Sequence, residues 1–453
     1  MSHLLTNPEF SSADCAEASA SRIVPKTPAV VVGADADGLG IARSLGVAGV
    51  SVILVDVNAR RPGMHSRSVR PYVVDALSGA VLVEGLLALR AHLDSKPALY
   101  LTSDAQVRTI SEHRKRMEGA FYHRLPSHRS VCALLHKAGF QREAERHGFP
   151  VPRAISVRDE RDLTELDKIR FPAVIKPGNK DLFFSGKVRR AWRVASREEA
   201  DSICRAILPQ ARDLLVQEWV EGQESDIYFC LQYRGEGGVT VRSFTGRKLR
   251  CWPPQTGSTA SCTVAPAADA ELERQTTAFF DKTQFTGMCS MEFKRDCRNG
   301  KFFMIEPTVG RTDWQEEVAT LNGVNIPLAA YCYELGQAIP AVRNPRNPVT
   351  WMYPPSYLRS VLAKGSFGGT QLEVRRMKTP CWSFDDPIPF VYFMREWFRK
   401  LPSRSRWREL IREQRWRINR ASTATTEGSI RNPTSLTHAA LRTASDPPSA
   451  KKA

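Results

Sequence analysis

Apolar runs separated by short polar turns divide the first hundred residues into alternating strands and helices. The expected elements are a strand at 29–32, a glycine-rich loop at 33–40, a helix at 41–47, a strand at 50–55 that ends at Asp56, and a strand at 98–102. Strand, glycine turn, helix and strand in this order are typical of a doubly wound α/β unit. The pattern therefore predicts an N-terminal α/β domain.

Farther along the chain, the pattern changes to one helix followed by short strands. The helix is expected from Ser130 to His147, because Gly148 and the prolines after it stop the helical pattern. The expected strands lie at 171–177, 214–220, 226–233, 239–245, 287–294 and 302–305. Their alternating, turn-punctuated pattern indicates antiparallel pairing, so the second region is expected to be α+β.

The ends of the chain differ in composition from its centre. Residues 1–26 and 421–453 are rich in small and polar residues, which predicts a disordered leader and a disordered tail. Tryptophan, tyrosine and proline cluster after Pro345. With 453 residues, of which 42% are hydrophobic, the chain is long enough for more than one core, so we expect a multidomain protein.

Charge and cysteine content restrict the class of protein. Much of the formal charge of +17 belongs to 395–420, where basic residues outnumber acids. The ten cysteines are scattered and form no C-x-x-C pair, which favours reduced thiols over a disulfide framework or a zinc site. We find neither a secretory signal nor an apolar run near the roughly 20 residues of a membrane-spanning helix. A cytoplasmic protein is therefore expected.

Two glutamates and a lysine interrupt apolar strands and are candidates for chemistry. Glu292 and Glu306 lie in strands joined by the turn 296–300, and period-two alternation can place both carboxylates on one face of the sheet. Two like charges would repel there unless a cation lay between them. Lys176 ends a buried apolar strand and needs a counter-charge, which a phosphate would supply. Solvent-facing strand acids are the alternative interpretation of the glutamate pair.

The order of these features resembles the ATP-grasp superfamily. The series consists of Lys137 in a helix, Lys176 at a strand end, the Gln-Glu-Trp-Val strand at 217–220 before a glycine and an acid, and the pair Glu292 and Glu306. Within the superfamily, the chain is similar to a branch of carboxylate–amine ligases related to D-aspartate ligase and carbamoyl-phosphate-synthase-like proteins. The resemblance runs from about Pro28 to about Gly336.

This resemblance implies an N-terminal doubly wound α/β (pre-ATP-grasp) domain followed by a two-lobed ATP-grasp fold. The implied segments are a disordered leader at 1–26, the pre-ATP-grasp domain at 27–126, the ATP-grasp domain at 127–345 with lobes at about 127–212 and 213–345, a C-terminal extension at 346–420 and a disordered tail at 421–453.

The resemblance also implies a binding site for ATP. The residues implied for nucleotide binding are the phosphate-contacting Lys137 and Lys176, the adenine-side strand residues Gln217, Glu218, Trp219 and Val220, and Glu224 for the ribose. Asp226 competes with Glu224 for the ribose role. The stretch from Gly178 to Arg190 corresponds to the loop that covers the phosphates, and its lysines and arginines either replace backbone amides there or form a basic surface turn.

The metal and acceptor sites follow from the same resemblance. The implied ligands of Mg²⁺, or of Mn²⁺, are Glu292, Glu306 and Thr308. Thr308 stands where the family usually carries asparagine, so binding of a second ion is in question. The residues implied to steady the acceptor carboxylate or the acyl-phosphate are Arg247, Lys248 and Arg311, since a guanidinium fork can hold a carboxylate through two bonds. A solvated basic hairpin is the alternative for the first two.

The implied function is that of an ATP-dependent ligase. Such an enzyme activates a carboxylate as an acyl-phosphate for attack by an amine or, less readily, a thiol or other nucleophile. The alternative is an ATP-binding regulatory or accessory protein with weak or lost catalysis, because Thr308 departs from the family pattern. A dinucleotide enzyme is disfavoured, since Asp35 takes the place of the central glycine in the fingerprint at 33–38 and would repel a pyrophosphate.

The expected partners are small carboxylate and amine substrates. No recognised nucleic-acid module accompanies the basic residues, so no specific nucleic-acid partner is expected. Trp397, Trp407 and Trp416 interleave with arginines in 395–420, which favours a peripheral contact with a membrane or another anionic partner.

Overall fold

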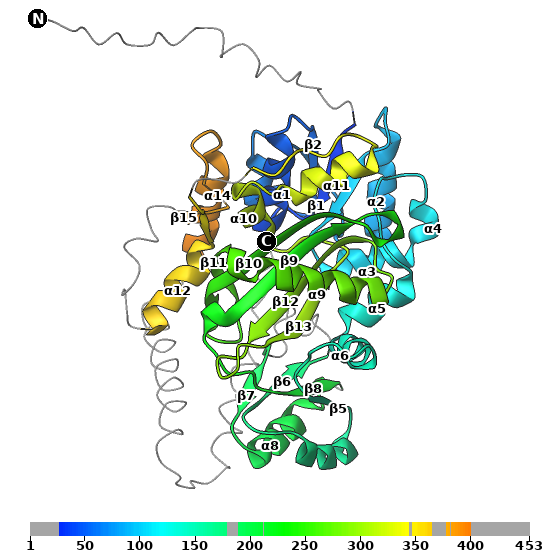
Figure 1. The fold of residues 1–453 in the computed structure, drawn as a ribbon. Helices are drawn as coiled ribbons and strands as arrows, with labels where there is room; N and C mark the ends of the chain where they lie inside the picture. Colours follow the sequence, from blue (N-terminus) through cyan, green and yellow to red (C-terminus); the bar gives the residue numbers. More distant parts are fainter. Residues whose placement is uncertain are drawn as a thin grey trace, which may run out of the picture.

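A computed structural model of the chain describes residues 27–178, 189–211, 213–343, 347–364, 377–380 and 382–399. The expected leader and tail and most of the Gly178–Arg190 loop lie outside these residues. The described part contains three β-sheets, with the N-terminal sheet and the four-stranded antiparallel sheet on opposite sides of a long seven-stranded sheet (Figure 1). No helix in this part of the chain is both long enough and apolar enough to cross a membrane.

The N-terminal sheet is parallel and has the strand order β3-β2-β1-β4. Its strands are β1 (Ala29–Val32), β2 (Val52–Asp56), β3 (Val69–Val73) and β4 (Ala98–Leu101), and its helices are α1 (Ala36–Gly46), α2 (Gly79–Ala91), α3 (Asp104–Glu112) and α4 (Arg114–Met117). The prediction of a doubly wound α/β unit is confirmed. The sequence pattern missed β3 because this edge strand is half exposed and contains Arg70 and Pro71, which interrupt any apolar run.

The four-stranded antiparallel sheet has the order β5-β8-β6-β7. It consists of β5 (Ala154–Val157), β6 (Ala173–Pro177), β7 (Trp192–Val194) and β8 (Leu214–Glu218), accompanied by α8 (Arg197–Ile207) and the 3₁₀ segment η2 (Glu160–Lys168). The two helical segments and one face of the sheet enclose a small core of aliphatic side chains.

The single helix predicted at 130–147 is wrong, because the structure has two helices there. They are α5 (His128–Leu135) and α6 (Lys137–Arg146). The break lies at His136, which has extended backbone angles and accepts a hydrogen bond from the Gly139 amide through Nδ1 (3.4 Å). A Cβ atom at Gly139 would lie 2.1 Å from the carbonyl oxygen of Ala133, so glycine permits this close turn. Lys137 is therefore the first residue of a helix.

The seven-stranded sheet has the order β13-β12-β9-β10-β11-β14-β15. Its strands are β9 (Ile227–Arg234), β10 (Thr240–Trp252), β11 (Ser258–Val264), β12 (Gly287–Arg295), β13 (Phe302–Val309), β14 (Thr350–Met352) and β15 (Met377–Lys378), and the helices of this region are α9 (Asp269–Lys282), α10 (Glu316–Leu321), α11 (Ile326–Glu334), α12 (Pro354–Lys364) and α14 (Ile388–Arg399). Two strands are longer than predicted. The basic cluster at 247–250 lies within β10 rather than after a strand, and β13 extends far enough to include Thr308.

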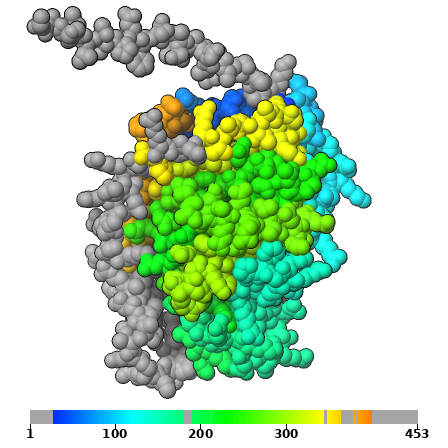
Figure 2. All heavy atoms as spheres, viewed as in Figure 1, coloured from blue at the N-terminus to red at the C-terminus, as the bar shows by residue number. Residues whose placement is uncertain are grey.

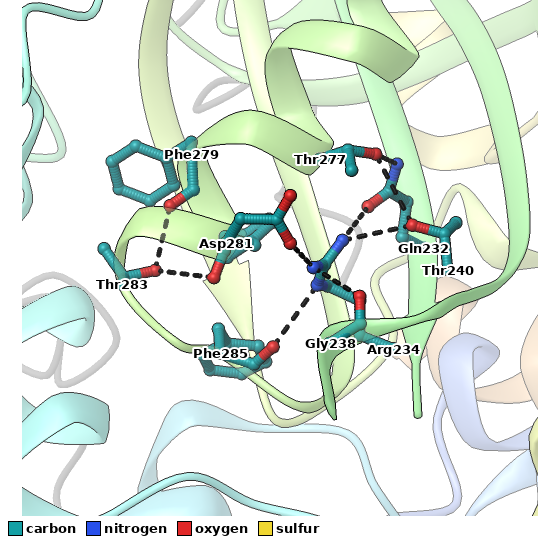
Figure 3. Close-up of polar contacts among 10 residues, drawn as sticks. Gln232, Arg234, Gly238, Thr240, Thr277, Phe279, Asp281, Thr283 and Phe285 are labelled. Carbon is teal, nitrogen blue, oxygen red and sulfur yellow. Dashed lines mark hydrogen bonds and ion pairs between the residues drawn. The ribbon is translucent and has the colours of Figure 1, made fainter. Parts of the chain in front are cut away.

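A buried arginine joins α9 to the end of β9 (Figure 3). The Arg234 side chain is fully buried, and its guanidinium donates to the carbonyl oxygens of Gly238 (2.6 Å) and Phe285 (3.2 Å). It also donates to Thr240 Oγ1 (3.1 Å) and forms an ion pair with Asp281. Several backbone and side-chain acceptors therefore depend on one planar donor.

Arg234→Met is expected to lower the free energy of unfolding by about 3 kcal/mol, because the buried carbonyl oxygens would lose their donor. Asp281→Asn should cost less, since the Asp281 side chain is 54% exposed. Thermal and urea unfolding of both variants would measure this difference. Equal stability of Arg234→Met and the unaltered chain would contradict the assigned role.

Candidate active site

A cavity between the four-stranded and seven-stranded sheets collects most of the residues implied for nucleotide binding. Those lining it are Lys137, Lys176, Gln217, Glu218, Trp219, Val220, Glu292 and Glu306. Arg190, Lys294 and the turn at 255–257 complete its wall. Residues from 137 to 306 in the sequence therefore meet around one space.

The segment at 217–220, which the resemblance implies for adenine, is held in place through its backbone. The Glu218 amide donates to the Arg153 carbonyl oxygen (2.8 Å), and the Trp219 amide donates to that of Pro172 (3.0 Å). The Arg193 guanidinium lies 4.8 Å from the centre of the Trp219 ring, close enough for a cation–π contact. An adenine contact through this segment would use backbone atoms other than these two amide groups.

The two lysines enter the cavity from different elements. Lys137 Nζ donates to the Pro177 carbonyl oxygen, and Lys176 Nζ donates to Gln217 Oε1, each over 2.8 Å. Burial lowers the pKa of Lys176, against the opposing effect of the Glu306 and Glu292 carboxylates. Gln217 in turn donates to Gln141 of α6 (3.2 Å), so a series of side-chain hydrogen bonds fixes Lys176 in position.

Glu292 and Glu306 are direct cross-strand partners in the β12–β13 hairpin. Thr308 follows two residues after Glu306, on the same face, and is paired with Ser290. Carboxylate and hydroxyl oxygens are hard donors of the kind that Mg²⁺ takes together with phosphate oxygens, so the three residues fit this ion. Among the described residues, no group of three or more His, Cys, Asp or Glu side chains forms a complete metal site. Mg²⁺ held by these residues would take further oxygen ligands from ATP phosphates.

A second cavity, of about 330 Å³, adjoins the first. Both are lined by Lys137, Arg190, Glu292 and Glu306. The lining residues found in the second cavity alone include Thr102, Ser103, Asp104, Phe229, Lys248, Thr308, Arg311, Asp313, Trp314 and Gln315. The glutamate pair thus lies on the border between two spaces.

Two implied acceptor residues in the second cavity are held by carboxylates. Lys248 Nζ lies 2.5 Å from Glu292 Oε2, and Arg311 Nε lies 2.5 Å from Asp104 Oδ1. Burial lowers the pKa of Lys248, but the adjacent Glu292 outweighs this effect and raises the pKa above its ordinary value. Both cations therefore stay charged at neutral pH.

The structure does not bring Arg247 or Glu224 to either cavity. Arg247 is paired with Tyr228, one residue out of phase with Lys248, so the two side chains point to opposite faces of the sheet. Glu224 is buried and accepts a hydrogen bond from the Cys251 amide (2.8 Å). Asp226, the competing candidate, accepts one from the Gln223 amide (2.7 Å) and also lines neither cavity.

Several lining residues were not singled out in the sequence, among them Lys294, Phe229 and Gln255. Lys294 is buried and donates to the Gln223 carbonyl oxygen. A signal for it existed, because a lysine that follows Glu292 by two residues on a strand shares its face. Thr102 lies after β4, and only the packing of the domains brings it into the second cavity.

Two buried acids join helix α1 of the N-terminal region to the loop after β13 and to α10. Thr312 Oγ1 donates to Asp37 Oδ1 (3.0 Å), and Ser44 Oγ of α1 donates to Glu316 Oε1 (3.0 Å). Burial raises the pKa of Asp37 to about 7 and that of Glu316 to about 8. This network supports the loop that carries Asp313 and the other lining residues next to it.

Glu316→Gln is expected to stabilise the protein increasingly as the pH rises from about 4.5 to about 8, with no further gain above that. Between the ordinary pKa of 4.5 and the native value of about 8, the native state binds more protons than the unfolded state. Stability from this group is therefore complete below about pH 4.5 and is lost as the pH rises through 8. At pH 9 the variant should be more stable by about 2 kcal/mol or more. Melting temperatures from pH 5 to 9 would check this, with the exposed Glu118→Gln as control.

Comparisons with known proteins agree with this architecture. The fold is similar to that of N5-carboxyaminoimidazole ribonucleotide synthetase (PurK) in complex with ADP, with a TM-score of 0.57 and 12% identity over 72% of this chain and 81% of the other. It is also similar to the biotin carboxylase domain of 2-oxoglutarate carboxylase from Hydrogenobacter thermophilus with MgADP and bicarbonate, with a TM-score of 0.54 and 13% identity over 71% and 73% of the chains. No family model matches the sequence.

The fold and the order of the site residues are similar to those of the ATP-grasp superfamily of ATP-dependent ligases. Among curated proteins, the chain is similar to D-aspartate ligase from Enterococcus faecium (strain Aus0004). The two sequences are 24% identical over 315 residues, which cover 66% of this chain and 74% of the relative. The resemblance stated from the sequence is confirmed.

Proposed function

We propose that the chain ligates a carboxylate to an amine at the expense of ATP, with the nucleotide in the first cavity and the acceptor in the second. The observation that carries this proposal is the position of Glu292 and Glu306, which line both cavities. A γ-phosphoryl group held there would face the acceptor space directly. Two anions can approach one another only where cations neutralise them, and Lys137 and Arg190 line the same border.

The proposed reaction has two steps. An oxygen of the acceptor carboxylate forms a bond to the γ-phosphorus while the bond to the β-phosphate oxygen breaks, which releases ADP. The amine nitrogen then attacks the acyl carbon, the bond to the phosphate oxygen breaks, and the amine proton leaves to solvent. Mg²⁺, when bound, would neutralise phosphate charge and orient the transferred group; Mn²⁺ is proposed as a substitute.

The residues of the chain would bind and orient the reactants. Lys137 and Lys176 would hold phosphate oxygens, while Lys248 and Arg311 would hold the acceptor carboxylate at the border of the cavities. Asp313 lines the acceptor cavity and would attract a cationic amino group. By analogy with the name of the curated relative, aspartate is the first substrate to test.

The remaining expectations from the sequence belong to the same proposal. Arg247, Glu224 and Thr308 keep their implied roles as predictions, together with the domain division at residues 126 and 345. Eight cysteines in the described part are free thiols, most of them buried, which supports a cytoplasmic location. Only the first five residues of 395–420 are described, so the contact of this whole segment with an anionic partner also stays a prediction.

The test is an ATP-consumption assay with amino acids and small amines, first singly and then in pairs. A carboxylate labelled with ¹⁸O should transfer one labelled oxygen to the released phosphate, which is the signature of an acyl-phosphate. Mass spectrometry would identify the amide. ATP binding without ADP formation in any mixture, together with no effect of Glu306→Gln, would support the regulatory alternative instead.

A further inference from the structure

The exposed face of α14 combines apolar and cationic side chains. Ile388, Val391 and Phe398 are 51%, 62% and 60% exposed, and they alternate along the helix with the exposed Arg395 and Arg399. Their spacing of three or four residues puts them on one stripe. The opposite face buries Pro389 and Phe393. Three large apolar side chains therefore lie on the face of the helix that does not pack on the protein. An exposed apolar stripe of this kind is typical of an interaction surface.

A cationic groove of about 440 Å³ lies beside this stripe. It is lined by Asn58, Arg60, His65, Tyr392, Arg395, Glu396 and Arg399. Its single acid, Glu396, lies 3.9 Å from Arg61, which does not line the groove. The groove therefore carries a net positive charge. The guanidinium groups in its lining can donate hydrogen bonds to phosphate oxygens.

The helix is fixed to the N-terminal domain, so stripe and groove form one surface. Asp386, just before α14, accepts hydrogen bonds from Ser66 Oγ (2.6 Å) and the Arg67 amide (3.1 Å). It also forms an ion pair with Arg43 (3.1 Å). The rings of His65 and Tyr392 are stacked with centroids 3.5 Å apart. In Figure 2 the segment that contains α14 (orange) borders N-terminal residues (blue) at the edge of the molecule.

We propose that this surface docks the protein on an anionic phospholipid bilayer. Apolar side chains that point outward between arginines are typical of helices that lie in the membrane interface, with the arginines at the level of the phosphates. Arg60 adds a cation from the N-terminal domain, more than 300 residues from α14 in the sequence. Among the described residues of the stripe and groove, Glu396 is the one acid, so charge complementarity favours an anionic surface. None of these residues lines the two catalytic cavities.

The test is sedimentation of the full chain with phosphatidylcholine vesicles that contain or lack phosphatidylglycerol. Binding should require the anionic lipid and weaken with salt. Arg60→Gln should weaken it about 5-fold, and the double variant Arg395→Gln/Arg399→Gln about 20-fold. Val391→Ser/Phe398→Ser should also weaken it, because the apolar contribution is lost. Arg70→Gln, an exposed arginine of the same domain outside the groove, is the matched control.

Arg60→Gln separates this surface from the basic residues that follow Arg399. If those residues alone bound lipid, Arg60→Gln and Val391→Ser/Phe398→Ser would behave like the unaltered chain, and the proposal would be overturned. Equal binding to neutral vesicles, or no vesicle binding at all, would also overturn it. Absence of binding to any vesicle is the result expected if the partner of this surface is a protein. Melting temperatures of each variant exclude loss of binding through unfolding.

Discussion

Glu306→Gln is expected to reduce ATP turnover by about 100-fold or more while leaving the fold intact. Glutamine keeps the shape of the side chain but removes its charge and one anionic oxygen. Glu306 lies directly opposite Glu292 and lines both cavities, so its charge is part of any cation site at the border. The substitution removes a repulsion from Glu292 but also an attraction to Lys176, so the melting temperature should change little.

The measurement is the rate of ADP formation over a range of Mg²⁺ concentrations, with Glu118→Gln as an exposed control. A raised Mg²⁺ requirement together with a lower maximal rate would show that the charge acts through the metal. Turnover within about 2-fold of the unaltered chain, under conditions where that chain is active, would contradict a metal role for Glu306.

Lys176→Met is expected to lower the ratio kcat/KM for ATP by about 100-fold. Lys176 is the proposed phosphate-contacting cation; it donates to Gln217, and Glu306 and Glu292 lie close enough to affect its pKa. Methionine has a similar length and suits burial, so the variant should fold. Burial of the charged amine is costly in the folded state, and removing it should even raise the melting temperature.

Lower activity combined with a higher melting temperature would show that Lys176 serves function rather than stability. Lys168→Met, an exposed lysine of η2 in the same lobe, should change neither quantity. If Lys176→Met lowered the melting temperature together with the activity, the lysine would belong to the structure of the lobe rather than to the ATP site.

The sequence predicted the parts of the fold that depend on local patterns. The apolar run at Ala29–Val32 and the acid-interrupted strands around Glu292 and Glu306 form strands in the structure, because burial of alternate or consecutive apolar residues needs no knowledge of distant partners. Elements without such a pattern were missed or misplaced. The edge strand Val69–Val73 carries polar residues, and the break at His136 depends on a close contact of Gly139 with the preceding helix.

Which residues face the site was decided by the tertiary structure. Arg247 and Lys248 are adjacent and equally basic, but strand pairing directs Lys248 towards Glu292 and Arg247 to the other face. Similarly, Asp104 reaches Arg311 only through domain packing. The sequence by itself determined the strands with a clear apolar pattern, the order of the lysines and glutamates, and hence the resemblance to the ATP-grasp superfamily. Strand register and domain packing decided which residues line both cavities. A shift of one residue in the register moves every side chain of a strand to the other face of the sheet, and the local sequence pattern does not specify the register.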